Sequence, residues 1–475
     1  MVGLLLLLAS ASSSMPVCCV PAAVPGDTRL ALPAPSADPL DDAGPADAVL
    51  ALEGDGRGSA GFLDMVHSSI ARHPALAETR ADEEAARAGR RVARSGLFPT
   101  IDAGLNFDHA LARQFGNNIN TIVEQSRLDG RTDVSVAASQ TLLDFGATSR
   151  SIRAANSRIK GAEAQTLDAE QNVAFLAIQA YYDLFLFQRE AELAASFQER
   201  QAQIRRAVED HVSQGTSARG DLSRIDASIF RINAQLANFQ RRLADAQARW
   251  SELSGLPVPA AVHRPEPAQT LAMTRDAAVA GAGALPSVRA ADMVAQAARY
   301  DAGSQHARML PQVSTTVNFG RYGVFEGLSD YDARAQVSLR QRFLGGLAAR
   351  ADQASAQARA AEARADRARE EAERDAAIAW SDLDALEAQL AAQRSSYVSA
   401  RRVRDVEAER FRVERGTLVD LLDAEETYYG VATNYISVLA QRDVARFALL
   451  MKSGKLDQAL ELASDNGRGA AGSSQ

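Results

Sequence analysis

The stretch LFPTIDAGLNF at residues 97–107 decides the fold, because a related stretch, MLPQVSTTVNF, stands at residues 309–319. Pro74 and Pro286 are separated by the same number of residues as the two stretches, so the match extends upstream of them. A fixed spacing between matching segments is the signature of an internal repeat. We therefore expect the chain to be a tandem duplication of one structural unit.

The downstream part of each unit repeats at a shorter spacing. Gln140 in SQTLLDFG corresponds to Gln341 in RQRFLGG, and Gly215 and Gly416 fall at that same spacing. The difference between the two spacings predicts a loop of variable length between the matched blocks.

Side chains at 101–108 and at 333–340 alternate between apolar and polar, which predicts strands with one face of each kind. A strand of about ten residues suits a tilted membrane crossing whose polar face lines a water-filled lumen. A soluble hairpin is the alternative, but an isolated hairpin is only marginally stable in water. Four strands cannot close a barrel, and an open edge in lipid leaves backbone groups unbonded. The chain is therefore expected to oligomerise, with three copies giving twelve strands.

Two long helices are predicted at 147–213 and 347–413, where the sequence contains no proline. At 1.5 Å per residue, about 65 residues extend roughly 100 Å, far beyond a single globular domain. A returning helix follows the first, and its apolar residues recur every three or four positions, which is typical of left-handed coiled-coil packing. These residues are Leu222, Ile225, Ile229, Ile232, Leu236, Phe239, Leu243, Ala246, Trp250 and Leu253.

The second long helix ends in FRVERGTLVDLLDAEETYY at 411–429. Gly416 is expected to interrupt the helix, and Thr417 to cap the returning helix by accepting a hydrogen bond from a free backbone N–H. Asp420 and Asp423 are three residues apart, so both carboxylates lie on one face of the first turns. Taken alone, they are ordinary partners of the helix dipole. If several copies met at this point, the carboxylates would form rings.

The remaining segments complete the predicted division of the chain. Residues 1–23 resemble an export signal, with a lipid-anchored Cys18 as a lesser alternative, and the proline-rich residues 24–58 are expected to be disordered. The first repeat then spans 59–256, a linker 257–270, the second repeat 271–455, and a flexible tail 456–475.

Composition excludes several classes of function. The net charge is -8, and arginines are interleaved with Asp and Glu along the helices, which argues against nucleic acid as a partner. The two cysteines are adjacent and the six histidines are scattered, so no metal site is expected. The sequence contains neither a phosphate-binding Gly-Lys-Ser loop nor a nucleophile elbow. We expect no cofactor and no enzymatic activity.

Two strands, a very long helix, a turn and a shorter returning helix, all repeated, resemble the TolC family of outer-membrane channel-tunnels. The motifs that carry the resemblance are LFPTIDAG, MLPQVSTT, QTLLDFG, RFLGG and GTLVDLLDAEETYY, and it covers about 60–455. It implies a mixed α and β membrane protein of Gram-negative cells. Three chains would form a twelve-stranded outer-membrane β-barrel, with four strands per chain, continued by an α-helical coiled-coil tunnel in the periplasm.

The resemblance also implies partners and site residues. Family members form homotrimers in outer-membrane lipid and work with a periplasmic adaptor, or membrane fusion protein, and an inner-membrane pump. Asp420 and Asp423 match the family's aspartate rings at the periplasmic entrance. The implied tip turns and adaptor contacts are Gly215, Asp221, Phe411, Arg415, Gly416 and Thr417.

At the second tip the sequence departs from the family pattern. Phe411 lacks the hydroxyl of the tyrosine that can bond to the first hairpin, and Glu414 stands where the family has glycine. An ion pair between Arg415 and Asp221 is the expected substitute.

Three functions fit the sequence. In detail, the chain resembles the outer-membrane component of the type I secretion system for the adenylate cyclase-haemolysin toxin. That resemblance implies a passive exit duct for a secreted protein, served by an inner-membrane ABC transporter. A channel for small-molecule efflux, of drugs or metals, is the first alternative, and a soluble coiled-coil scaffold is the second.

Overall fold

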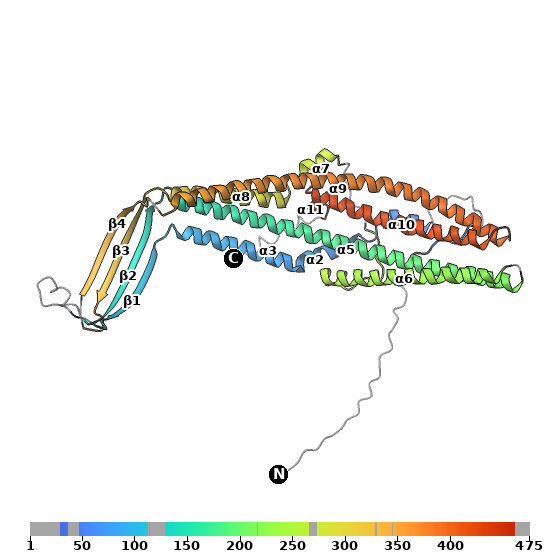
Figure 1. Cartoon of the computed structure of the whole chain (residues 1–475), viewed down its shortest axis with the longest axis horizontal. Helices are drawn as coiled ribbons and strands as arrows, with labels where there is room; N and C mark the ends of the chain where they lie inside the picture. Colours follow the sequence, from blue (N-terminus) through green and yellow to red (C-terminus); the bar gives the residue numbers. More distant parts are fainter. Residues whose placement is uncertain are drawn as a thin grey trace, which may run out of the picture.

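The computed structural model describes residues 29–36, 47–112, 114, 129–215, 217–265, 273–327, 330–343 and 345–460. A four-stranded sheet lies at one end and a layer of long helices extends from it (Figure 1). The strands are β1 (Thr100–His109), β2 (Gly130–Leu143), β3 (Gln312–Tyr322) and β4 (Asp330–Arg340). The longer helices are α2 (Ser59–Arg72), α3 (Pro74–Ser95), α5 (Ala147–Ser213), α6 (Arg219–Ser254), α8 (Pro286–Ala307), α9 (Leu347–Arg412) and α10 (Leu418–Lys452). Shorter helical segments are α1 (Ala48–Ala51), η1 (Leu52–Gly54), α7 (Arg275–Ala282) and α11 (Leu456–Ala459).

The internal repeat predicted from the sequence is confirmed by equivalent hydrogen bonds. The side-chain amide of Gln140 donates to the carbonyl oxygen of Leu97 at 3.1 Å, and that of Gln341 donates to Met309 at 2.8 Å. Each bond ties the end of one strand to the chain entering its partner strand. The duplication thus preserved the contact that fixes where the sheet joins the helices.

The strands pair in the order β1-β2-β3-β4, all antiparallel, and their register keeps one face apolar across the sheet. Leu105 lies opposite Val134, and Val136 opposite Phe319. This face is bare in the single chain, where Ile101 and Leu339 are 70% and 71% exposed. An apolar face of this extent is suited to lipid.

Among the described residues, β1 pairs only with β2 and β4 only with β3. The sheet therefore ends in two unpaired edges.

No helix in the described part of the chain is both long enough and apolar enough to cross a membrane.

The apolar stripe predicted along 222–253 is the face by which α6 packs on α5. Ile225, Ile232, Ala246 and Trp250 are buried, and the other stripe residues pack partly buried beside them. Because both helices are long and carry one stripe each, they form an antiparallel hairpin. In the second repeat α9 and α10 form the equivalent hairpin (Figure 1).

The prediction of disorder over 24–58 is wrong for the residues of this segment that the structure describes. Residues 29–36 and 47–54, which we call the strap, cross from α5 to α9. The backbone N–H groups of Leu30 and Leu32 donate to Glu192 and Ser196 of α5. On the other side, Arg404 of α9 donates to the carbonyl oxygen of Pro33 at 3.0 Å. Proline and alanine provide no periodic face, but their backbone still forms these bonds.

The predicted tail at 456–475 also needs correction at its start. Residues Leu456–Ala459 form α11, and Leu456 and Leu460 are almost completely buried. These two side chains pack into the main apolar cluster, and Asp457 of the same turn accepts a hydrogen bond from Gln171 of α5 at 2.9 Å. The remainder of that tail, and the predicted signal at 1–23, lie outside the described residues.

Candidate functional site

The turn at 413–417 joins α9 to α10 at the end of the molecule far from the sheet (Figure 1). The N–H groups of Arg415 and Gly416 both donate to the carbonyl oxygen of Arg410, at 2.8 and 3.0 Å. These bonds fold the turn back over its own helix. At Gly416 a Cβ atom would lie 3.1 Å from Arg410 and Phe411, so close backbone approach favours glycine here.

Glu414 occupies the left-handed region with φ of 59°. It ends α9 in the conformation that glycine adopts with least strain. In the first repeat the corresponding residue is Gly215, with φ of 79°, which follows the C-cap of α5. The sequence-based match of Gly215 to Gly416 is therefore two residues out of register. The second tip has no glycine at this position, and Glu414 adopts the left-handed conformation in its place.

Thr417 caps α10 as predicted. Its hydroxyl oxygen accepts from the N–H of Asp420 at 3.2 Å, and the hydroxyl donates to the Asp420 carboxylate at 2.8 Å. This exchange fixes the Asp420 side chain at the start of the helix, where the dipole favours negative charge.

Asp420 and Asp423 are both exposed on the first turns of α10. Asp423 lies close enough to Arg231 of α6 to act on its charge: the pKa of Arg231 is raised, first by its hydrogen bond to Glu426 and then by the charges of Glu426 and Asp423. The single chain thus presents two exposed carboxylates at the tip, and Arg231 lies near one of them, Asp423.

The two hairpins touch near their tips through an apolar cluster. Ile204 and Val208 of α5 and Ile225 of α6 pack with Leu418 and Leu421 of α10. The ring of Phe411 adds to it, with its centroid 5.5 Å from the ring of His211. Phe411 therefore joins the hairpins by packing, where a tyrosine would use a hydroxyl.

Ion pairs also join the hairpins, but not the predicted one. No ion pair joins Arg415 to Asp221 in the described part of the chain, because the turn carrying Arg415 folds back on α9. Instead, Arg231 of α6 pairs with Glu426 of α10.

At the neighbouring residue of α10, Arg200 of α5 donates to Glu425 at 3.1 Å. The Glu425 side chain is completely buried and that of Arg200 is 27% exposed, so this second pair is less accessible to water than the first. Shielding strengthens it relative to the exposed pair at Arg231.

The strap is anchored by a buried carboxylate that the sequence did not indicate. Asp47 accepts from the Tyr397 hydroxyl at 2.9 Å and from Arg401 at 2.8 Å, both on α9. It also caps α1 by accepting from the N–H groups of Val49 and Leu50. The position of Asp47 before an apolar run could have predicted a helix start there, since Asp is a preferred N-cap. It was hidden within a segment predicted to be disordered.

A second buried ion pair holds the predicted linker in place. Arg264 donates to both carboxylate oxygens of Asp443, at 2.5 and 3.0 Å, and both side chains are 1% exposed. Arg264 also donates to the backbone carbonyl of Glu53 in the strap. The segment before 266 is therefore a packed part of the fold.

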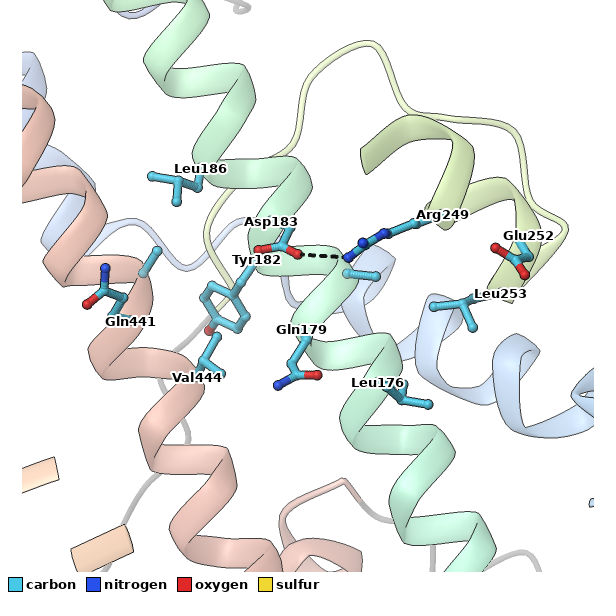
Figure 2. A pocket seen from close by; sticks show the side chains of 12 residues that line it. Leu176, Gln179, Tyr182, Asp183, Leu186, Arg249, Glu252, Leu253, Gln441 and Val444 are labelled. Atoms are coloured by element: carbon cyan, nitrogen blue, oxygen red, sulfur yellow. Dashed lines mark ion pairs between the residues drawn. The ribbon is translucent and has the colours of Figure 1, made fainter. Parts of the chain in front are cut away.

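The hollow shown in Figure 2 lies between α5, α6 and α10 and has a volume of about 510 Å³. Leu176, Leu186, Leu253 and Val444 make much of it apolar, and Asp183 faces Arg249 at 3.9 Å on its rim. Burial raises the pKa of Asp183 and the charge of Arg249 opposes that rise. These side chains form an apolar hollow with one ion pair, and no nucleophile and base converge in it.

The described residues contain no group of three or more His, Cys, Asp or Glu side chains placed to hold a metal ion. The site residues that the fold brings together are those of the tip and of the strap.

Comparison with known proteins identifies the fold and the family. The chain is 24% identical over 337 residues to the outer membrane efflux protein BepC of Brucella suis biovar 1, covering 68% of this chain and 72% of BepC. The crystal structure of VceC from Vibrio cholerae has a TM-score of 0.74 at 17% identity, covering 85% of this chain and 97% of VceC. The outer-membrane channel OprN has a TM-score of 0.74 at 22% identity, covering 90% of this chain and 97% of OprN. These structures share the fold.

The family model described as outer membrane efflux protein matches residues 65–256 and 284–454, well over half of the chain. The match includes both hairpins and all four strands. A soluble scaffold is not consistent with it. The chain therefore belongs to the outer membrane efflux protein family, the TolC-type channels of the outer membrane.

Proposed function

We propose that three copies of this chain form a passive duct through the outer membrane and periplasm. The observation that carries the proposal is the four-stranded sheet with one apolar face and two unpaired edges. Each unpaired backbone group in lipid costs several kcal/mol, so β1 of one copy must pair with β4 of the next. Three copies give twelve strands, enough for an open lumen. In this assembly residues 59–256 and 271–455 act as the two repeats, joined by the linker at 257–270.

The tip of the second hairpin is proposed as the periplasmic entrance. Around a threefold axis, Asp420 and Asp423 of three copies form two rings of carboxylates, and like charges held close together attract polyvalent cations. Gly215, Asp221, Phe411, Arg415, Gly416 and Thr417 shape the two tip turns on which an adaptor docks. Opening exchanges one set of helix contacts for another, so the adaptor and pump must supply the difference in binding energy.

The entrance is tested by single-channel conductance in planar bilayers. Replacing both Asp420 and Asp423 by alanine is expected to abolish block by a trivalent cation applied from the periplasmic side and to change cation conductance. Asp382 and Asp384, two exposed carboxylates on the shaft of α9, provide the matched control when replaced by alanine. Unchanged block in the Asp420/Asp423 variant would exclude this entrance.

For the cargo we propose protein export: the chain serves as the exit of a type I secretion system, with an inner-membrane ABC transporter and a periplasmic adaptor. The resemblance of the strand and tip motifs to a toxin-export component supports this choice. The relative BepC is an outer membrane efflux protein, which favours small molecules as the second candidate.

Deletion of the gene separates the two cargo classes. Protein export predicts loss of one or more secreted proteins from the culture medium with unchanged drug susceptibility. Small-molecule efflux predicts the reverse, a fall in the inhibitory concentrations of several drugs with an unchanged secreted proteome. Complementation with the wild-type chain is the control for both readouts.

A further inference from the structure

The last two turns of α3, before the chain enters β1, are strongly basic. They contain four arginines and no acidic residue: Arg87, Arg90, Arg91 and Arg94. Together with Ile159 and Glu163 of α5, these arginines line a groove of about 350 Å³ between the two helices. We call these four residues the arginine patch.

Most of the charge in this patch is not neutralised by the chain itself. Arg87 pairs with Glu83, and its distance to Glu163 is 4.0 Å. No carboxylate within the described ranges lies at ion-pair distance from Arg90, Arg91 or Arg94, and all three are exposed. A solvated helix face is usually balanced by interleaved acids, as in the first half of α3. The patch therefore leaves about three positive charges for an outside partner.

The patch borders the part of the chain that faces lipid. Arg94 precedes Leu97 and Phe98 by less than two turns, and these side chains are 52% and 60% exposed. Phe343, at the end of β4, is 87% exposed at the same junction of sheet and helices. Exposed apolar and aromatic side chains at the ends of strands mark the membrane interface. The polar headgroup layer is roughly 5–7 Å thick on each side of the hydrocarbon core, so it lies within reach of long arginine side chains.

The side of the helical layer on which the patch lies follows from the elements that cover α5. Tyr181 of α5 is buried under α2, with its ring centroid 5.2 Å from that of Phe62. Its hydroxyl lies within hydrogen-bond distance of the carbonyl oxygens of Gly58 and His263, at 3.1 and 3.0 Å, so its proton is shared between them. In a duct these covering segments must lie outside, because inside they would fill the lumen. Tyr181 therefore marks the outer side of α5.

Glu163 and Glu170 lie on that same side of α5. Residues seven apart lie on one side of such a helix, and steps of seven from these two glutamates lead to Ala177 and Leu184. Ala177 and Leu184 lie about one turn before and one turn after Tyr181, on the same side. The partners of the two glutamates on α3 are Arg87 and Arg80, the latter at 3.8 Å from Glu170. The patch thus faces the outside of the duct.

We propose that the arginine patch binds the phosphate groups of anionic phospholipids in the periplasmic leaflet of the outer membrane. This assignment rests on the proposed duct, which sets the outer side and the level of the bilayer. Guanidinium groups bind phosphate oxygens in bidentate fashion, and four of them on adjacent turns can hold a headgroup against the groove. Each trimer has three such patches. They would fix the depth of the barrel in the membrane from the periplasmic side.

Lipid retention by the purified trimer tests the proposal. The trimer is reconstituted in nanodiscs of phosphatidylethanolamine with a fifth of phosphatidylglycerol, extracted gently, and its retained lipids are counted by native mass spectrometry. The test variant is Arg90→Gln/Arg91→Gln/Arg94→Gln. At about 1 kcal/mol per arginine near an anionic surface, the triple variant should bind phosphatidylglycerol roughly a hundredfold more weakly. Binding in discs without phosphatidylglycerol should be the same for both proteins.

The control is Arg359→Gln/Arg364→Gln/Arg367→Gln, which removes the same charge from exposed positions further from the membrane on α9. Its lipid retention should equal that of the wild type. Equal retention by the test variant would overturn the proposal, and so would its elution as a monomer, which would assign the arginines to contacts between copies. Failure of the duct itself would appear separately, as a wild-type protein that forms no trimer and conducts no ions.

Discussion

The strap is the feature whose energetics can be worked out most fully. Asp47 has a completely buried side chain, and it accepts hydrogen bonds from Tyr397, Arg401, Val49 and Leu50. Replacing Asp47 by alanine removes one partner of a buried ion pair, which costs about 3–5 kcal/mol, and it removes an N-cap, which costs about 1 kcal/mol. Asparagine keeps the cap and the shape, so Asp47→Asn should cost roughly half as much, about 1–3 kcal/mol.

These losses should appear as local opening of residues 47–54. Among the described residues, the other polar contacts of this segment with the rest of the chain are all made by Glu53, with Arg264, Tyr435, Arg394 and Arg442, so Asp47 alone makes those of its first turn. The combined cost of about 4–6 kcal/mol raises the open population by about three to four orders of magnitude at 1.4 kcal/mol per tenfold. Hydrogen exchange of residues 47–54, followed by mass spectrometry, should accelerate by about the same factor in Asp47→Ala.

The matched control is Asp245→Ala, which removes an exposed ion pair with Arg241, 66% and 64% exposed, and should leave exchange unchanged. Protection of 47–54 that is the same in Asp47→Ala and wild type would refute the reasoning, because it would mean that the strap is held by something other than its buried carboxylate.

Three further outcomes are expected. Both Glu414 and Gly215 have positive φ, which glycine adopts with least strain. Glu414→Gly should therefore stabilise the second tip by up to about 1 kcal/mol, and Gly215→Ala should destabilise the first by about the same amount. The denaturation midpoints of the two variants should move in opposite directions. Burial raises the pKa of Glu190 to about 7, although the charge of Arg242 opposes the rise. Between about pH 4.5 and 7 the folded chain therefore holds a proton that the unfolded chain has released. Stability should then fall as the pH rises from about 4.5 to 7, and Glu190→Gln should remove this fall in thermal midpoints measured at pH 5 and pH 8. Gly58→Ala should prevent correct folding, because its Cβ would lie 2.0 Å from the carbonyl oxygen of His263, whereas Gly54→Ala, with nothing within 4 Å, should be tolerated when both are compared by yield of trimer.

The sequence predicted the strands and hairpins because their signals are local and periodic. Alternation at 101–108 needs no knowledge of distant residues, and the duplication supplied each signal twice. The capping role of Thr417 was equally local, since an N-cap is read from the residue and its helix. The same holds for Asp420, whose N–H is the donor in that cap.

The contacts that the sequence did not predict join residues far apart in the chain. Asp47 meets Tyr397, and Arg264 meets Asp443, and neither pair leaves a mark on local periodicity. The expected Arg415 pair failed for a different reason. The backbone of the turn, bonded to Arg410, decides where that side chain lies, and its bonds depend on the left-handed conformation of Glu414, which sequence reasoning would not assign to a glutamate.

The distribution of contacts between the hairpins indicates where an opening movement would bend them. At the tip, Arg231 and Glu426 are 54% and 49% exposed, and such a pair contributes at most about 1 kcal/mol. At the level of the strap, Tyr397 of α9 bonds both Asp47 and Tyr428 of α10, all buried. The strap in turn is bonded to α5, so the three helices are tied together there.

A movement that separated the hairpins along their whole length would have to break these buried bonds in addition to the tip contacts. Bending confined to the few turns between the strap and the tip would break only the apolar cluster around Leu421, the pair of Arg200 with Glu425, and the exposed pair. In α9 this interval begins after Arg404, which holds the strap, and ends at Phe411, which packs on His211. We infer that the hinge of the second hairpin lies within these two turns, and that the strap fixes its upper limit.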